Sequence, residues 1–130
     1  MYRILLADDE GIMLESLKKI IETEYGNECE IHCAKSGRVV VEMAQAYPPD
    51  ICFMDIQMPV MNGRDAAKQI RSMDRKDAGE IPIFALSADA FVEDQRLSAM
   101  SGMNGHFTKP IDFEEMRVQI GKILKGRRKY

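Results

Sequence analysis

Acidic, hydroxyl and ammonium side chains recur in this chain, each directly after a short apolar run. Asp8 and Asp9 follow the first such run, and Asp55 follows the third. Ser87 follows the fourth run and Lys109 follows the fifth. If the runs are strands of one parallel sheet, these side chains converge in one crevice at the carboxyl ends of the strands. Acids this close raise one another's pKa or require a counter-ion, so the pattern predicts a cation site beside a carboxylate.

Phosphoryl transfer is the chemistry that suits such a crevice. One lysine offsets only part of the charge of three acids, and a hard divalent cation such as Mg²⁺, which prefers oxygen ligands, offsets more. The cation and Lys109 would neutralise the oxygens of a transferring phosphoryl group while an aspartate oxygen attacks in line. The Ser87 hydroxyl and nearby backbone N–H groups would hydrogen-bond the same oxygens.

Each of these residues also has a plainer interpretation. Asp9 or Glu10 could favour the start of a helix. Asp55 could be a turn residue, and Lys109 could be a solvated loop charge. Each plain interpretation is reasonable for one residue. It is improbable that all of them are correct at once when every residue follows an apolar run, so one shared site is the stronger interpretation.

Alternating apolar runs and helical periods indicate the fold that positions these residues. Most runs are apolar throughout, as in strands of a parallel sheet that is covered on both faces. Segments of helical period lie between them, so the pattern predicts an α/β fold with right-handed crossovers. The expected strands are Arg3–Ala7, Glu30–Ala34, Ile51–Met54, Ile81–Leu86 and His106–Thr108.

The helices are predicted from apolar stripes. The first spans about Gly11–Tyr25 and the fourth about Ala90–Met100, where a sparse stripe is consistent with loose packing. Asp112 precedes the last helix and Glu115 follows three residues later, which predicts a capping box. The expected stripes are Met13, Leu17, Ile20 and Ile21 in the first helix, Phe91, Leu97 and Met100 in the fourth, and Phe113, Met116, Ile120, Ile123 and Leu124 in the last.

Composition limits the class of protein. The chain has 130 residues, 45% apolar and 30% charged, which is typical of a soluble globular domain. We therefore expect a single domain over residues 1–130, in which 121–130 form a helix end and a basic tail that could begin a linker. The net charge of −3 does not favour nucleic acid or an anionic membrane. No run is long enough to span a bilayer or resembles a signal peptide, so a cytoplasmic location is expected.

The three cysteines raise the question of a metal site. Cys29 and Cys33 flank His32, but in a strand the two thiols point to one face and the imidazole to the other. An odd number of cysteines also argues against a disulfide framework. We expect Cys29, Cys33 and Cys52 to be buried apolar thiols.

Four segments in order resemble the receiver domains of two-component response regulators. The resemblance covers about Tyr2 to Leu124 and implies a flavodoxin-like, doubly wound, five-stranded parallel sheet in order 2-1-3-4-5 with five helices. It implies a signalling switch rather than an enzyme, one that catalyses its own phosphorylation from phosphodonors and its own dephosphorylation. The segments are Ile4-Leu5-Leu6-Ala7-Asp8-Asp9-Glu10, Met54-Asp55-Ile56-Gln57-Met58-Pro59-Val60-Met61-Asn62-Gly63, Ala85-Leu86-Ser87-Ala88 and Thr108-Lys109-Pro110.

The resemblance implies a phosphoacceptor and a metal site. Asp55 is the expected phosphoacceptor for a phosphoryl group supplied by a histidine kinase. Mg²⁺ is the expected cofactor, bound by Asp8, Asp9, Asp55 and the backbone carbonyl of Gln57. Gly63 would relieve strain in the loop that follows Asp55.

The remaining implied roles concern the response to phosphorylation. Ser87 occupies the position of the switch hydroxyl, and the backbone of Ala88 is expected to contact the phosphoryl group. Lys109 looks like the phosphate-binding lysine, and a cis peptide bond to Pro110 is common in the family. The surface implied to change is the fourth helix, the fifth strand and the fifth helix.

Three further positions concern the conformational switch and the lifetime of the phosphorylated form. His106 lies three residues before the lysine, where the family often has Tyr or Phe, and it could turn inward as Ser87 moves toward the phosphate. A surface histidine without a switching role is the alternative. Gln57 and Asp89 lie two residues beyond Asp55 and Ser87, where the family places residues that border the attacking water and tune dephosphorylation.

Two enzyme or cofactor classes compete with the switch. A haloacid dehalogenase-type phosphatase requires Asp-x-Asp at its nucleophile, and Asp55-Ile56-Gln57 lacks the second acid. A flavodoxin-like cofactor module needs backbone donors and hydroxyls after its first strand, where Asp8-Asp9-Glu10 would repel a phosphate.

The identity of the whole protein stays open. A first strand close to Met1 suits a free-standing regulator or an N-terminal module, whereas the stretch Ser87–Asp112 also resembles receivers attached to sensor histidine kinases. The expected partners are a sensor histidine kinase or phosphotransfer protein and a downstream effector. We expect no membrane and no nucleic acid to bind this chain, and either a monomer or a dimer formed on phosphorylation.

Overall fold

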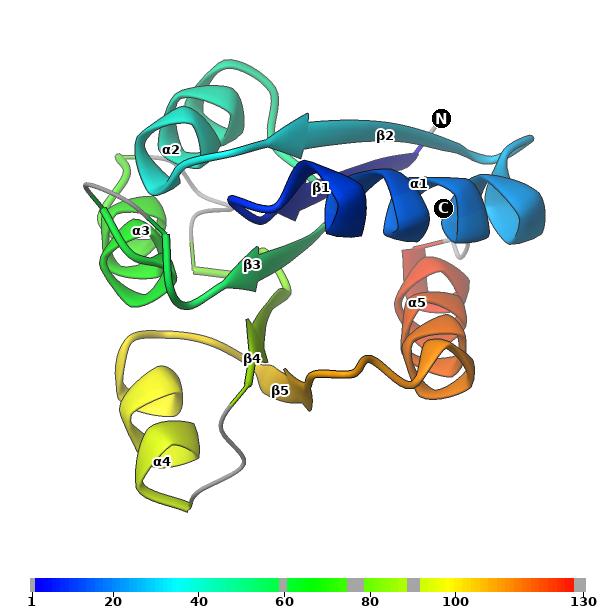
Figure 1. Cartoon of the computed structure of the whole chain (residues 1–130). Helices are drawn as coiled ribbons and strands as arrows, with labels where there is room; N and C mark the ends of the chain where they lie inside the picture. The colour runs from blue at the N-terminus through cyan, green and yellow to red at the C-terminus, as the bar shows by residue number, and fades with distance from the viewer. Residues whose placement is uncertain (1, 59–60, 75–78, 89–91, 128–130) are drawn as a thin grey trace.

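A five-stranded parallel sheet forms the centre of the chain, in the order β2-β1-β3-β4-β5 (Figure 1). The computed structural model describes residues 2–58, 61–74, 79–88 and 92–127. Its elements are β1 (Tyr2–Ala7), α1 (Gly11–Tyr25), β2 (Cys29–Ala34), α2 (Gly37–Ala46), β3 (Ile51–Asp55), α3 (Gly63–Arg71), β4 (Ile83–Ser87), α4 (Val92–Met100), β5 (Gly105–Thr108) and α5 (Phe113–Arg127). The predicted fold class and strand order are confirmed.

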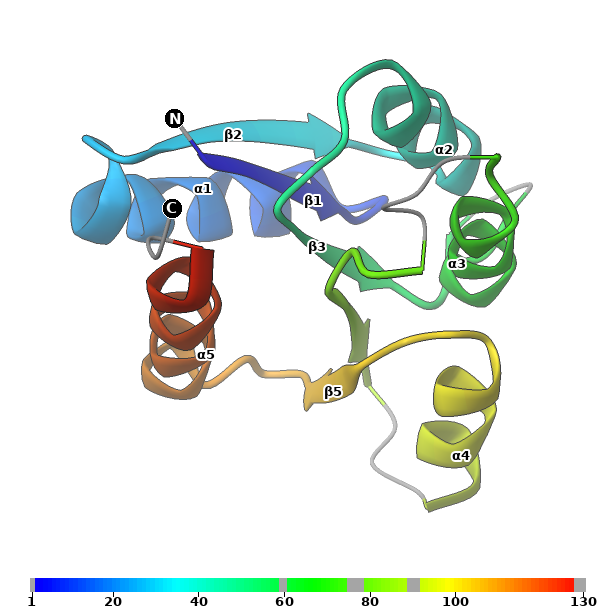
Figure 2. The same cartoon turned by 180° about the vertical axis from the view of Figure 1, so that it is seen from behind.

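Helices cover both faces of the sheet, with α1 and α5 on one side and α2, α3 and α4 on the other (Figures 1 and 2). Alternate residues of the strands therefore enter two separate cores. Ile4 and Phe53 pack with α1 and α5, whereas Leu5 and Met54 pack with α2 and α3. Every residue of β3 and β4 is buried, which explains why these runs lack a polar alternation.

Several strand boundaries differ from the prediction by one or two residues. β4 begins at Ile83 rather than Ile81, because Pro82 has no N–H to donate to the ladder, although its carbonyl accepts from Cys52 N–H at 2.8 Å. At their other ends, β3 and β4 include Asp55 and Ser87. The two functional candidates are thus the last residues of strands rather than the first residues of loops.

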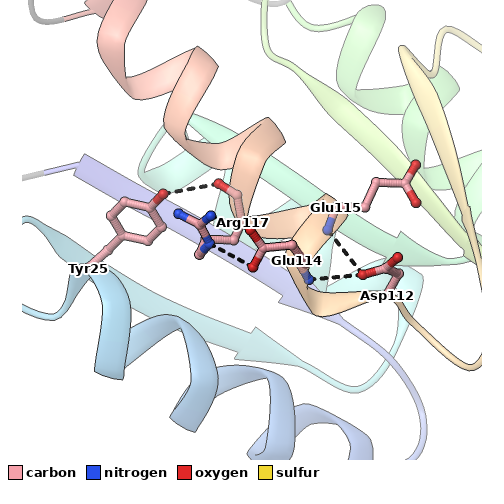
Figure 3. Close-up of polar contacts among 5 residues, drawn as sticks. All are labelled: Tyr25, Asp112, Glu114, Glu115 and Arg117. Carbon is pink, nitrogen blue, oxygen red and sulfur yellow. Dashed lines mark hydrogen bonds and ion pairs between the residues drawn. The ribbon is translucent and has the colours of Figure 1, made fainter.

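The contact between α1 and α5 fixes the last helix (Figure 3). The Tyr25 hydroxyl of α1 donates to the Arg117 carbonyl of α5 at 3.0 Å. Asp112 Oδ1 accepts the N–H groups of Glu114 and Glu115 at 3.0 and 3.2 Å, which confirms the predicted helix start. The buried stripes are Leu14, Leu17 and Ile21 in α1 and Met116, Ile120 and Leu124 in α5. Phe113, expected in the last stripe, is 38% exposed.

The expected apolar stripe of α4 is wrong. Leu97 and Met100 are 38% and 72% exposed, and Phe91 lies outside the described residues. Ser98 is instead the buried α4 side chain among residues 95–100, and its hydroxyl accepts from Arg64 Nε of α3 at 3.3 Å. A polar contact occupies the place where an apolar stripe was expected.

Cys29 and Cys52 are buried as predicted, whereas Cys33 is only half-buried. Within the described residues, they form no group of potential metal ligands with His32. Among the described residues, no helix is both long and apolar enough to cross a bilayer.

Candidate functional site

The carboxyl ends of β1, β3, β4 and β5 bring the predicted site residues to one edge of the sheet. Asp8 follows β1, Asp55 ends β3, Ser87 ends β4, and Lys109 follows β5. Backbone hydrogen bonds continue the sheet past its strands at this edge. Lys109 N–H donates to the Ser87 carbonyl at 2.7 Å, and Asp8 N–H donates to Ala34 at 3.1 Å. The positions of the four residues therefore follow from strand pairing.

Lys109 joins the two most buried acids of the site. Its ammonium group lies 2.9 Å from Asp8 Oδ2 and 3.4 Å from Asp55 Oδ2. Asp8 is fully buried and Asp55 is 5% exposed. One positive charge thus faces two buried carboxylates.

Backbone donors hold the remaining oxygens of both carboxylates. Asp8 Oδ1 accepts the Glu10 N–H at 2.9 Å, and Asp55 Oδ1 accepts the Gln57 N–H at 3.3 Å. Each carboxylate is therefore oriented from the loop that follows its own strand. Two roles are predicted for Gln57, its backbone carbonyl as a metal ligand and its side chain as a residue that tunes dephosphorylation. In the structure its N–H has a partner in Asp55, and its side chain is exposed.

Protonation of Asp55 reflects this environment. Burial, and then the charge of Asp8, raise the pKa of Asp55 from 3.8 to about 6, despite the opposing effect of Lys109. Burial by itself would lower the pKa of Lys109, but its hydrogen bond to Asp8 and the two carboxylate charges raise it. The site thus holds more negative charge than one lysine offsets.

An acidic group lies beside this pair. Carboxylate oxygens of Asp8, Asp9 and Glu10 come within 4.8 Å of one another, with Asp8 buried and the other two exposed. Glu10, predicted only to favour a helix start, occupies the N-cap position of α1, but its side chain makes no capping hydrogen bond. Asp55 is not part of that group and is linked to it through Lys109.

The predicted switch residues occupy the neighbouring strands. Ser87 is 7% exposed, Ala88 is exposed, and Asp89 lies outside the described residues. His106 is half-buried on β5 opposite Ala85, and both of its ring nitrogens are shielded from solvent. It lines a groove of about 250 Å³ between α4 and β5, together with Gln95, Ser98, Ala99, Met103, Asn104 and Gly105. The expected cis peptide bond between Lys109 and Pro110 is present.

Gly63 is required for a reason other than the predicted relief of strain. A Cβ at Gly63 would lie 2.4 Å from the Asp55 carbonyl oxygen, so the two backbones approach too closely for any side chain. Its N–H donates to the Ile56 carbonyl at 2.9 Å. This contact closes the loop after Asp55 onto its own strand.

Gly37, at the start of α2, makes a similar contact that sequence reasoning missed. A Cβ there would lie 2.2 Å from the Met61 carbonyl oxygen on the far end of the same loop. The residues are 24 positions apart, so no local pattern could have indicated it.

Known proteins share both the sequence pattern and the fold. The model of the response regulator receiver domain matches residues 4–121. Probable histidine kinase 6 of Oryza sativa subsp. japonica is 31% identical over 95% of this chain, which spans 14% of that protein.

Two solved structures extend the comparison. One is the receiver domain of Ssk1 from Saccharomyces cerevisiae, co-crystallised with the phosphotransfer protein Ypd1 (28% identity, TM-score 0.82, 92% of this chain and 86% of that chain). The other is the receiver domain of sensor histidine kinase PA1611 from Pseudomonas aeruginosa, with a magnesium ion in its active site cleft (24% identity, TM-score 0.83, 95% of this chain and 98% of that chain). With its sheet order, its acidic edge and the family match over residues 4–121, the chain belongs to the response regulator receiver domains of two-component signalling.

Proposed function

We propose that Asp55 accepts a phosphoryl group from a phosphohistidine of a sensor histidine kinase or phosphotransfer protein. The observation that carries this proposal is the Lys109 ammonium group between Asp8 and Asp55, 2.9 and 3.4 Å from their oxygens. An Asp55 oxygen attacks phosphorus, the P–N bond of the donor breaks, and the donor nitrogen leaves with the electron pair. With a pKa of about 6, Asp55 is mostly ionised at neutral pH and able to attack.

The acidic residues fit a magnesium ion. The available donors are oxygens, two buried carboxylates share one lysine, and exposed acids lie beside them. Asp8, Asp9, Asp55 and the backbone carbonyl of Gln57 would hold the ion. Bound there, it would supply positive charge to the phosphoryl oxygens. The magnesium in the cleft of the PA1611 receiver supports this choice of ion.

Phosphorylation of Asp55 would change the partners of Lys109 and Ser87. A phosphoryl group adds about −1.5 to −2 charges and three acceptors, so Lys109 would bind it in place of the two carboxylates. The Ser87 hydroxyl and the Ala88 N–H would donate to its oxygens, and His106 would repack beside the α4–β5 groove. The altered surface would be α4, β5 and α5, with Gln57 and Asp89 tuning the rate at which water removes the group.

The donor protein would approach the same edge of the sheet. Ile12, at the start of α1 next to the acidic residues, is 84% exposed and offers an apolar contact. The complex of the Ssk1 receiver with a histidine phosphotransfer protein supports a partner of this kind. We place all 130 residues in one cytoplasmic receiver domain, in which residues 121–130 form a helix end and a basic tail that would begin a linker.

A receiver within a hybrid histidine kinase, acting in a phosphorelay, is the second candidate. The match to 14% of a probable histidine kinase favours it, because such a chain would be one module of a larger protein. In that case the phosphoryl group on Asp55 would pass on to a histidine of a phosphotransfer protein. Transfer of the phosphoryl group from Asp55 to a histidine would favour the phosphorelay receiver over the receiver of a response regulator.

Intact-mass spectrometry tests the proposal. The chain is incubated with acetyl phosphate, with and without Mg²⁺, as wild type and as Asp55→Asn. We expect one phosphoryl adduct that requires both the metal and Asp55. An adduct that persists in Asp55→Asn would move the phosphoacceptor elsewhere, and an adduct formed equally well in EDTA would exclude the metal.

A further inference from the structure

A cavity of about 190 Å³ lies on the α2 side of the sheet, between β1, the edge strand β2 and the segment that follows α2. Leu5 of β1, Met43 of α2 and Pro49 are among the residues that line it. Leu5 precedes Asp8 by three residues on an extended chain, so roughly 10 Å of backbone separates the cavity from the acidic edge. The proposed phosphoacceptor chemistry does not use this cavity.

Incomplete cover by α2 leaves the cavity open. Val40 and Ala44 of α2 are fully buried against this face of the sheet, whereas Met43 is only partly buried. The β2 residue that pairs with Leu5 is His32, and it is exposed. A polar side chain at the edge of the sheet thus stands where an apolar one would have packed under the helix.

Contacts of Arg3 fix the walls of the cavity. Arg3 N–H donates to Asp50 Oδ2 at 2.7 Å, and the Arg3 carbonyl accepts from Asp50 N–H at 2.8 Å, which ties the segment after α2 to β1. The Arg3 guanidinium lies 5.1 Å from the centre of the Tyr47 ring, which lines the cavity and is 63% exposed at its mouth. A ligand would therefore enter a preformed site, which reduces the ordering cost of binding.

The lining of the cavity favours an uncharged ligand. Besides Tyr47, it consists of four apolar residues and of Arg3 and His32. Glu30 Oε2 lies 3.6 Å from Arg3 Nε and 3.7 Å from His32 Nε2, so the charge of Arg3 already has a partner at the rim. A charged ligand would leave water without gaining a counter-charge of its own.

The size of the cavity and two of its residues favour a single aromatic ring. A cavity of about 150 Å³ lined by aliphatic side chains is large enough to hold benzene. The Met43 thioether and the Tyr47 ring are groups that make favourable contacts with aromatic molecules. We propose that this cavity binds a small uncharged aromatic molecule, with its ring between Leu5, Met43 and Tyr47.

A titration of the full chain with benzyl alcohol, followed by NMR of the side-chain methyl groups, tests the proposal. We expect saturable shifts of the Leu5 and Met43 methyl signals, with a dissociation constant of about 1 mM, as for a ligand of about eight heavy atoms. Benzoate and benzylamine carry the same ring with a negative or a positive charge, and each should bind at least about fivefold more weakly. The absence of saturation, or equal or tighter binding of either charged molecule, would overturn the inference.

Substitutions at the cavity locate the bound ring. Met43→Trp fills part of the space and should weaken benzyl alcohol binding by at least about tenfold. Met100→Trp is the matched control, because Met100 is also a helix residue but is 72% exposed, and its affinity should stay within about twofold of wild type. Unchanged affinity in folded Met43→Trp would mean that the molecule binds elsewhere and would overturn the inference.

A second variant covers the case in which Met43→Trp does not fold. Tyr47→Ala removes the aromatic wall at the exposed mouth and leaves the buried core intact. We expect it to bind benzyl alcohol about threefold to tenfold more weakly, the usual contribution of one aromatic pair. Affinity equal to that of the wild type in Tyr47→Ala would then count as the contradicting result.

Discussion

The Lys109 ammonium group forms ion pairs with two carboxylates, Asp8 and Asp55, which lie at the ends of different strands. The charge balance of the site depends on this one lysine. Asp8 and Asp55 are both buried, so each is costly to ionise without a partner. The consequence appears at Asp55, whose pKa of about 6 means that folding favours its protonated form more than the unfolded chain does. Ionised Asp55 therefore destabilises the metal-free protein.

Asp55→Asn should stabilise the metal-free chain at neutral pH. The folded-state pKa of Asp55 lies above its ordinary value, so its contribution to stability is full below about pH 4 and is lost as pH rises through 6. We expect the free energy of unfolding at pH 7.5 in EDTA to rise by about 1 to 2 kcal/mol, with the gain shrinking toward pH 4. Urea denaturation at several pH values measures it.

The exposed Asp74 provides the control for this substitution. Asp74→Asn should change stability by less than about 0.5 kcal/mol at each pH. A loss of stability in Asp55→Asn at pH 7.5 would show that ionised Asp55 supports the fold, contrary to the argument.

Residue identity and spacing predicted Asp8, Asp55, Ser87 and Lys109 at one edge, because parallel strands place their carboxyl ends together. They could not predict that the Asp55 and Asp8 carboxylates take their backbone donors from Gln57 and Glu10. Those hydrogen bonds depend on loop geometry, which has no periodic signature in the sequence.

Among the elements, α4 departs furthest from sequence expectation, and its attachment is polar. Its C-terminal end is held by Arg71 of α3, whose guanidinium donates to the Gly102 carbonyl at 3.0 and 2.8 Å and to Asn104 Oδ1 at 2.9 Å. Asn104 Oδ1 also accepts from Ile83 N–H at 2.8 Å, so the α4–β5 turn is tied to β4. The apolar pattern of the sequence could not predict this attachment of α4, because a guanidinium group, a backbone carbonyl and a side-chain amide make it.

Arg71→Ala should destabilise the chain by about 2 kcal/mol, because it leaves the Gly102 carbonyl without its charged donor. Arg71→Lys should recover less than half of this loss, since an ammonium group cannot reproduce the forked contact. The exposed Lys68 on the same helix is the control, and Lys68→Ala should change stability by less than about 0.5 kcal/mol. The measurement is the urea concentration at the midpoint of unfolding, compared between variants whose free energy of unfolding has the same dependence on urea. Equal losses of stability in Arg71→Ala and Lys68→Ala would contradict the argument.

For the molecule as a whole, strand order and helix layers followed from the buried runs, while the contacts between distant loops did not. Gly37 and Met61 belong to different connections and meet only because α2 and α3 pack on the same face of the sheet. In a single cooperative domain, a ligand that binds only the folded state stabilises the whole fold. Binding of a cation at that edge should therefore be visible in global unfolding.

Mg²⁺ should raise the melting temperature of the whole chain at pH 7.5. At a concentration about ten times its dissociation constant, a ligand of the folded state adds about 1.4 kcal/mol, or about 5 °C for a chain of this size. The rise should be smaller at pH 5, where Asp55 is largely protonated, and smaller in Asp55→Asn, which lacks one carboxylate ligand. Differential scanning calorimetry with NaCl at matched ionic strength separates binding from screening. An equal rise in NaCl would mean that the acids are merely screened, and a full rise in Asp55→Asn would place the ion away from the proposed phosphoacceptor.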